Sequence, residues 1–275
     1  MNAGSKQSGP AFVSALSLAV ALRSIDLTYS NNCVTIHPMA SSLSITPHFE
    51  LSARPAKVIF FDVNGTLLDM SKVKKAIIKA FGNKQAFNQW FLLLLQHSLV
   101  DTVTASYHGF GVIGDAALDM TAAMLQEKPL KPAKKQEILA LMHELDVYPD
   151  VPAGLEILLQ AGYRLIALTN STQSGLDQQL KQAGIIGYFE QGLSVDSVQR
   201  YKPHPDTYHM AARQAGVAPS AAIMIAAHGW DIAGALHAGM KAGYIARPPQ
   251  TLYPLAPNPT YSGKTLVEIA QQLAL

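Results

Sequence analysis

Cysteine is almost absent from this sequence of 275 residues, because Cys33 is the only one. A single cysteine excludes an internal disulfide and any metal site built from several cysteines, which fits a reducing compartment. The chain also lacks a long basic block. Its formal net charge is +2, and the short lysine run at 71–79 is typical of a solvated helix face. We therefore expect no nucleic-acid partner.

The N-terminal region lacks an apolar run long enough to cross a membrane. Its apolar patch, residues 11–22, is shorter than the roughly 20 residues that a spanning helix needs. The patch has the length of a signal-peptide core, but Arg23 and Asp26 follow where a small-residue cleavage site belongs. We expect a cytoplasmic protein that does not enter a membrane. The alternatives are export to the periplasm with residues 1–22 as a signal peptide, and a true translation start at Met39. Residues 1–55 are expected to be an extension that is disordered or removed.

Short apolar runs that are typical of buried strands recur from residue 57 onward. The run "KVIFFD" at 57–62 has no polar alternation, as expected of a strand buried on both faces of a parallel sheet. Further strands are predicted at 163–169, 187–195 and 222–226, with an edge strand at 242–246. Helices are predicted between them at 174–184, 205–216 and 231–239, each closed by a glycine. This alternation predicts an α/β fold with a doubly wound, Rossmann-like parallel sheet.

The segment between the first two strands, residues 71–148, contains no convincing strand. Apolar residues recur there at helical spacing in four stretches, namely 72–81, 87–100, 115–125 and 134–145. An insert at this point lies over the carboxyl edge of the sheet, where open α/β sheets bind ligands. We therefore predict a core domain of residues 56–70 and 149–275, with a helical cap domain of residues 71–148.

Polar side chains follow the predicted strands at the same edge of the sheet. Each has an ordinary structural explanation, since a strand-end aspartate often caps a helix and a lysine before proline is usually a surface residue. Together they predict an active site. The candidates are Asp62, Thr169, Asn170, Lys202, His228 and Asp231.

These residues stand in motifs that resemble those of the haloacid dehalogenase superfamily. The motifs are Asp62 in "FFDVNGTLLD", Thr169 in "LTNS", Lys202 in "YKP" and Asp231 in "WDIAGA", within residues 57–250. The stretch "LSVDSVQRYKPHPDTY" and the Trp-Asp pair at 230–231 resemble the type II 2-haloacid dehalogenase branch.

The resemblance implies a role for each matching residue. Asp62 would be the nucleophile, and Lys202 the cation paired with Asp62 and Asp231. Thr169 and Asn170 would bind the substrate carboxylate. The other residues expected to contact substrate or support the loop are Asn64, Thr66, Phe91, Tyr208 and Trp230.

Two positions separate this chain from the magnesium-dependent phosphatases of the superfamily. Those enzymes carry a general-acid aspartate where this chain has Asn64, and a magnesium-binding carboxylate where it has Ala227. Phosphoryl transfer uses magnesium to neutralise charge, whereas a halide leaves without a proton or a metal. We therefore expect neither metal nor cofactor. A phosphatase with magnesium held by Asp62 and Asp231, and a catalytically silent binding protein, are the alternatives.

The halide site departs from the pattern of the branch. The resemblance implies an arginine just after a cap-helix tryptophan, but Phe91 follows Trp90 here. The candidates to receive the halide instead are Asn170, Trp230 and His97.

The group that handles the hydrolytic water also differs. His228 stands where better-known relatives place an asparagine, and Gly65 stands where some relatives carry an acid. An imidazole can act as a base near neutral pH, whereas an asparagine cannot. A histidine–carboxylate pair would then need Asp231 or Asp69 to orient His228.

The sequence thus predicts a hydrolase of carbon–halogen bonds that acts on short 2-haloalkanoic acids. Asp62 displaces the halide, and water positioned by His228 cleaves the resulting ester. The aliphatic run at 90–100 is too continuous for one helix face. Part of it could meet a second copy in a homodimer, the alternative being burial within the cap.

Overall fold

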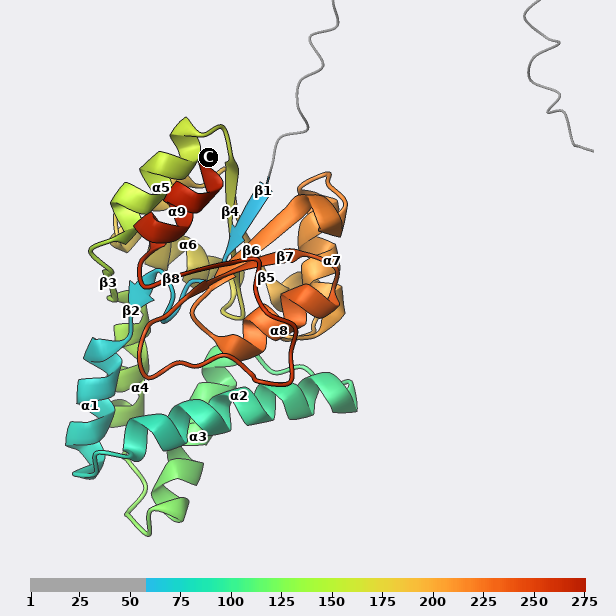
Figure 1. Cartoon of the computed structure of the whole chain (residues 1–275). Coiled ribbons are helices and arrows are strands. Elements are labelled where there is room, and N and C mark those ends of the chain that lie inside the picture. Colours follow the sequence, from blue (N-terminus) through green and yellow to red (C-terminus); the bar gives the residue numbers. More distant parts are fainter. Residues whose placement is uncertain (1–57) are drawn as a thin grey trace, which may run out of the picture. The chain divides into compact units, whose positions relative to one another are not determined.

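The computed structural model describes residues 58–275 of the chain (Figure 1). The predictions for residues 1–55, including Cys33 and the apolar patch at 11–22, concern residues outside this range and stay predictions.

A six-stranded parallel sheet forms the centre of the described region (Figure 1). Its strand order is β5-β4-β1-β6-β7-β8, so the chain winds outward in both directions from β1. This arrangement confirms the predicted doubly wound α/β fold. The strands are β1 (Val58–Phe61), β4 (Arg164–Thr169), β5 (Gln191–Ser194), β6 (Ala222–Ala226), β7 (Lys241–Ile245) and β8 (Tyr261–Gly263).

The sheet differs from the prediction at two places. β7 was expected at the edge, but it pairs with β8, so that expectation is wrong. β8 has only three residues, with a serine and a glycine, and so lacks a strand pattern. β5 is shorter than its predicted range 187–195, because the turn η2 (Ile186–Tyr188) takes up the first part of that range.

Helices cover both faces of the sheet (Figure 1). Alternate side chains of a strand point to opposite faces. Ile59 and Phe61 belong to one buried cluster together with residues of α5 and α9, whereas Val58 and Phe60 belong to another with residues of α7 and α8. The core helices are α5 (Val151–Gln160), α6 (Gln173–Gln182), α7 (Pro205–Gln214), α8 (Gly229–His237) and α9 (Leu266–Leu273).

A layer of helices lies beyond one end of the sheet (Figure 1). It consists of α1 (Ser71–Phe81), α2 (Ala86–Thr104), α3 (Phe110–Met124) and α4 (Pro132–Ala140), followed by the turn η1 (Leu141–His143). Each of the four predicted helical stretches overlaps one of these helices. The insert was expected to hold no strand, but β3 (Asp146–Val147) pairs antiparallel with β2 (Leu68–Asp69). The domain boundaries themselves stay a prediction.

Side chains of the second helix hold this layer together and leave part of it exposed. The indole N–H of Trp90 donates to the carbonyl of Gly114 in α3, at 2.9 Å. Trp90, Leu93 and Leu94 are buried, whereas Leu92 and Val103 are 62% and 85% exposed. The aliphatic run therefore packs within the layer on one side and presents apolar side chains to solvent on the other.

The helical layer also contacts the core through the C-terminal end of α2 and through the α2–α3 loop. The hydroxyl of Thr102 accepts a hydrogen bond from the backbone N–H of Tyr201 at 3.0 Å. The hydroxyl of Tyr107 donates to the carboxylate of Asp196, and its ring stacks on that of Tyr201 with centroids 5.3 Å apart. These contacts keep the helices over the carboxyl ends of the strands.

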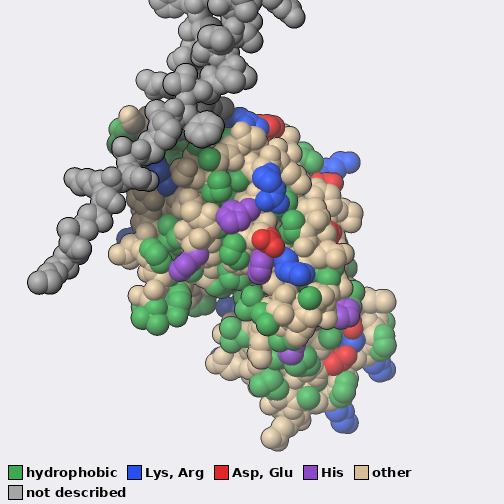
Figure 2. All heavy atoms as spheres, turned by 90° about the vertical axis from the view of Figure 1, so that its right-hand side faces the viewer, with side chains coloured by type: hydrophobic (Ala, Val, Ile, Leu, Met, Phe, Trp, Pro, Cys, Tyr) green, Lys and Arg blue, Asp and Glu red, His purple; other side chains and the backbone are tan. Residues whose placement is uncertain are grey.

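Charged side chains of both signs lie scattered over the face that carries α7 and α8, without a basic patch there (Figure 2). Among residues 58–275, no helix combines the length and the apolarity that a bilayer span requires.

Candidate active site

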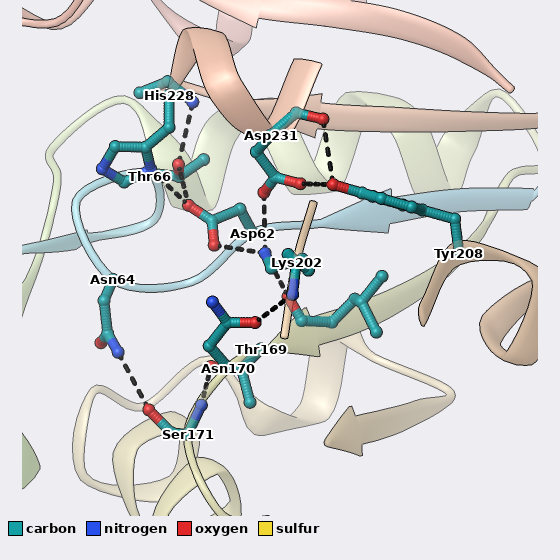
Figure 3. Close-up of polar contacts among 12 residues, drawn as sticks. Asp62, Asn64, Thr66, Thr169, Asn170, Ser171, Lys202, Tyr208, His228 and Asp231 are labelled. Carbon is teal, nitrogen blue, oxygen red and sulfur yellow. Dashed lines mark hydrogen bonds and ion pairs between the residues drawn. The ribbon is translucent and has the colours of Figure 1, made fainter. Parts of the chain in front are cut away.

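Asp62 lies at the carboxyl end of the central strand β1, and both of its carboxylate oxygens are bound (Figure 3). Oδ1 accepts a hydrogen bond from Nζ of Lys202 at 2.7 Å. Oδ2 accepts one from the hydroxyl of Thr66 at 2.6 Å and lies 2.9 Å from Nδ1 of His228. The Thr66 hydroxyl in turn accepts from the backbone N–H of Ala227 at 2.9 Å. The carboxylate is therefore fixed in one orientation.

Lys202 connects two carboxylates in the interior (Figure 3). Its side chain is fully buried, and Nζ lies 2.7 Å from Asp62, 2.7 Å from Oδ2 of Asp231 and 3.0 Å from the carbonyl of Leu168. The three hydrogens of the ammonium are thus all used. The other oxygen of Asp231 accepts a hydrogen bond from the Tyr208 hydroxyl at 2.6 Å.

The charges of this cluster shift the pKa values of its members. Burial alone raises the pKa of Asp62, but the ammonium of Lys202 and the hydrogen bond with His228 outweigh it and hold that pKa well below the ordinary range. Burial opposes the charge of Lys202, yet the carboxylates of Asp231 and Asp62 raise its pKa. Burial and the nearby charge of Asp62 raise the pKa of Asp231. Asp62 is therefore an anion at neutral pH.

The loop after β4 presents an amide with free hydrogen-bonding capacity. Oδ1 of Asn170 accepts from the backbone N–H of Lys202 at 2.9 Å, which fixes the orientation of the amide. Its Nδ2 is buried and has no partner among the described residues. The hydroxyl of Thr169 accepts from the backbone N–H of Ser171 at 3.1 Å and keeps its own hydrogen available.

His228 is oriented by Asp62 itself. Asp231 is bound to Lys202 and Tyr208, and Asp69 accepts hydrogen bonds from Ser71. The expectation that Asp231 or Asp69 orients His228 is therefore wrong. The sequence could not show that Asp62 orients His228. Both residues stand at strand ends, and whether their side chains meet depends on their rotamers.

Gly65 is explained by its place beside the imidazole of His228. Its φ of +79° is in the left-handed region, and a Cβ there would lie 3.1 Å from Cε1 of His228. The imidazole also contacts two aromatic rings, with centroids 5.8 Å from that of Phe91 and 5.2 Å from that of Trp230. A side chain at position 65 would strain the backbone and bring its Cβ tightly against the ring, which would have to shift by a few tenths of an ångström.

A narrow cavity of about 20 Å³ opens on Asp62 between the sheet edge and the helical layer. Of the predicted residues, it is lined by Asp62, Asn64, Phe91, Thr169, Asn170, His228 and Trp230. Lys202, Asp231, Thr66 and Tyr208 lie behind the carboxylate and do not line the cavity. His97, a candidate for the halide, lies in a separate pocket between α2 and α3.

Several residues of the site were not predicted from sequence. Ser171 and Gln179 form hydrogen bonds with Asn64. A signal existed for Gln179, which shares the buried face of α6 with Leu176 and Leu180. A polar residue on an apolar stripe calls for an explanation. The apolar lining of the cavity was also missed, namely Met70, Leu94, Leu95, Phe110 and Met142.

The residues present do not fit a magnesium site of the phosphatase kind. Both carboxylates that would hold the ion are already bound to Lys202, and position 227 carries a fully buried alanine. Within residues 58–275 there is no group of three or more acidic, histidine or cysteine side chains placed to hold a metal ion.

A buried carboxylate at the end of a central parallel strand, with a lysine shared by a second carboxylate and a helical layer above, forms a site whose chemistry is compatible with hydrolysis through an aspartate nucleophile. A family model of haloacid dehalogenase-like hydrolases matches residues 56–239. The chain belongs to this family.

Characterised relatives share most of the described region. The chain is 30% identical over 202 residues to (S)-2-haloacid dehalogenase 4A of Burkholderia cepacia, an alignment that covers 72% of this chain and 86% of that protein. It is 29% identical over 198 residues to (S)-2-haloacid dehalogenase 1 of a Pseudomonas strain, covering 70% and 86%. The structure of L-2-haloacid dehalogenase from Xanthobacter autotrophicus superimposes with a TM-score of 0.73 at 23% identity, over 79% of this chain and 98% of that one.

Proposed function

We propose that the protein hydrolyses the carbon–halogen bond of short 2-haloalkanoic acids. The observation that carries the proposal is the ionised, buried carboxylate of Asp62 beside a cavity, because a desolvated and aligned carboxylate is a competent nucleophile. Relatives at 29–30% identity bear the name (S)-2-haloacid dehalogenase. Asp62 attacks C2 of the substrate, the halide leaves with the bonding electrons, and an ester of Asp62 forms.

Water then cleaves the ester at Cγ of Asp62. Esterification removes the negative charge that holds the imidazole of His228, whose Nδ1 lies 2.9 Å from Oδ2 in the free site. The imidazole is then able to position a water and accept its proton. Attack at Cγ breaks the bond to the alkyl oxygen, which takes up the proton and leaves as a 2-hydroxyalkanoate. In a single turnover in heavy-oxygen water, the label should therefore enter Asp62 and not the product.

The substrate carboxylate is bound by the side chains of Thr169 and Asn170 at the cavity wall. The unpartnered Nδ2 of Asn170 supports this role, since a buried donor without an acceptor is costly unless a ligand supplies one. Phe91 occupies the position after Trp90, so no arginine receives the halide there. We assign the departing halide to the ring edges of Phe91 and Trp230, which carry the positive part of the aromatic quadrupole.

The cavity holds about one water molecule, so substrate access requires the helical layer or its side chains to move. We assign α1–α4 the role of a cap that closes over the bound substrate. Closure would exclude water until the ester has formed.

The direct test is halide release from chloroacetate and 2-chloropropionate, measured beside phosphate release from p-nitrophenyl phosphate with and without magnesium. We expect halide release that survives EDTA and disappears in Asp62→Ala. Phosphate release that depends on magnesium would overturn the proposal in favour of a phosphatase. Inactivity toward both substrates would favour a binding protein that has kept the fold.

We further propose a cytoplasmic homodimer. The exposed apolar side chains on the outer faces of α2 and α3 support the interface, chiefly Leu92, Val103, Val112 and Met124. Light scattering should give the mass of two chains for the wild type and of one chain for Leu92→Glu combined with Val103→Glu.

A further inference from the structure

The side chain of Gln179 contacts Asn64, which lines the cavity, although Gln179 belongs to none of the sequence motifs. Its side chain is buried on α6, and its Nε2 donates to the carbonyl of Met142 at 2.6 Å and to Oδ1 of Asn64 at 2.9 Å. Its Oε1 is buried without a partner among the described residues. An unpaired buried acceptor destabilises the fold, so an apolar side chain would serve better if Gln179 only filled space.

The donors and acceptors around Gln179 determine how the amide of Asn64 is turned. A backbone carbonyl can only accept, so the atom of Gln179 that faces Met142 is its nitrogen. The second hydrogen of that nitrogen needs an acceptor, which places Oδ1 of Asn64 toward Gln179. Nδ2 of Asn64 is thereby turned to the hydroxyl of Ser171, 3.2 Å away (Figure 3). One hydrogen of Nδ2 is used in the bond to Ser171. The other has no acceptor among the described residues, and Asn64 lines the cavity.

We propose that Gln179 is a positioning residue that holds the amide of Asn64 with an N–H, rather than the carbonyl oxygen, available to the substrate carboxylate. The proposal rests on the proposed function, because the anion it serves is that of the 2-haloalkanoate. A donor to a carboxylate forms a charge-assisted hydrogen bond, whereas a reversed amide would repel the anion. Gln179 therefore controls affinity for the carboxylate and does not act on the halide.

The test compares Gln179→Met with Gln182→Met, a matched control on the exposed face of the same helix. Kinetics are measured with 2-chloropropionate and 2-bromopropionate. We expect Gln179→Met to raise KM for both substrates by about tenfold, the effect of losing roughly one oriented hydrogen bond to a charged group. The ratio of kcat for bromide over chloride should stay at the wild-type value, and Gln182→Met should match the wild type.

A double-mutant cycle separates positioning from a purely structural role. In the Asn64→Ala background, Gln179→Met should raise KM no further, because the amide that it orients is gone. Independent, multiplicative effects on KM would overturn the proposal. If Gln179→Met does not fold, Gln179→Glu carries the test. Burial keeps its carboxyl group protonated, so that the hydroxyl still donates to the carbonyl of Met142. The hydroxyl oxygen then accepts from Nδ2 of Asn64 and reverses the amide, so KM should rise, and an unchanged KM would refute the proposal.

The wild-type measurement distinguishes the two failures. A wild type that releases no halide from either substrate refutes the proposed function together with this inference. An active wild type with an unchanged KM in Gln179→Met refutes only the role of Gln179.

Discussion

Replacing Lys202 with methionine would leave the carboxylates of Asp62 and Asp231 buried without their shared cation. The Lys202 side chain is fully buried and lies 2.7 Å from each carboxylate. Removing one partner of a buried ion pair costs about 3–5 kcal/mol, because the remaining charge stays desolvated. Methionine keeps most of the apolar stem, so the loss is electrostatic rather than one of packing. We expect the free energy of unfolding at neutral pH to fall by about 3–5 kcal/mol.

The pH dependence of stability should shift in this variant toward lower stability at higher pH. In the wild type the pKa of Asp62 is lowered, so its contribution is present above the unfolded pKa near 3.9 and is lost as the pH falls through the folded pKa. Without Lys202, the pKa of Asp231, which burial already raises, rises further because the cation that lowers it is gone. The contribution of Asp231 is then present at low pH and is lost as the pH rises through the raised pKa. Urea denaturation should therefore show Lys202→Met to be more stable near pH 5, about one unit above the unfolded pKa, than near pH 8.

A second substitution tests whether uncompensated buried charge causes the loss of stability in Lys202→Met. Asp62→Asn removes one of the two uncompensated charges, so the double variant with Lys202→Met should be more stable at neutral pH than Lys202→Met alone. Halide release should be abolished in both. A loss below about 1 kcal/mol for Lys202→Met, the range of surface ion pairs, would refute this account. So would a double variant in which the two losses simply add.

Three further predictions concern other parts of the site. His228→Ala can neither accept a proton nor position a water, so we expect a normal burst of halide but about a hundredfold slower steady turnover; mass spectrometry should find the ester, and wild-type turnover would exclude His228 as the base. Gly234→Ala would place a Cβ 2.4 Å from Cβ of Pro203 and 2.6 Å from the Tyr208 hydroxyl. It should cost about 1–3 kcal/mol in urea denaturation, and an unchanged midpoint would contradict this. Because the pKa of Asp62 is lowered, the halide burst in rapid-quench assays should be independent of pH between about 5 and 8; an acid limb in that range would show that Asp62 takes up a proton.

The sequence was sufficient to predict the cluster at the sheet edge. Parallel strands place their carboxyl ends together, so a polar residue after each buried run is expected at one site. Asp62, Lys202 and Asp231 are joined by ion pairs of 2.7 Å although 140 and 29 positions separate the lysine from the two acids. Strand type and order therefore carry most of the information about this cluster.

Contacts that depend on rotamers or on irregular segments could not be predicted in this way. The pairing of His228 with Asp62 depends on how an imidazole packs over Gly65. β8 was missed because its sequence, Tyr-Ser-Gly, has no strand pattern, and it forms only because β7 offers a free edge. The contact of Gln179 with Asn64 joins a helix interior to a loop, and neither segment indicates the other.

The neutral residues at positions 64 and 227 are consistent with the need to keep Asp62 ionised. Ala227 is fully buried, and its N–H donates to the hydroxyl of Thr66, which donates in turn to the carboxylate of Asp62. A carboxylate at either position would add negative charge near Asp62 and raise its pKa. A phosphatase compensates such charge with magnesium, whereas Lys202 already serves two carboxylates here. Asn64 and Ala227 therefore do more than remove a general acid and a metal ligand. They leave Lys202 with two carboxylates to neutralise and no more, which is what the proposed metal-free attack by Asp62 requires.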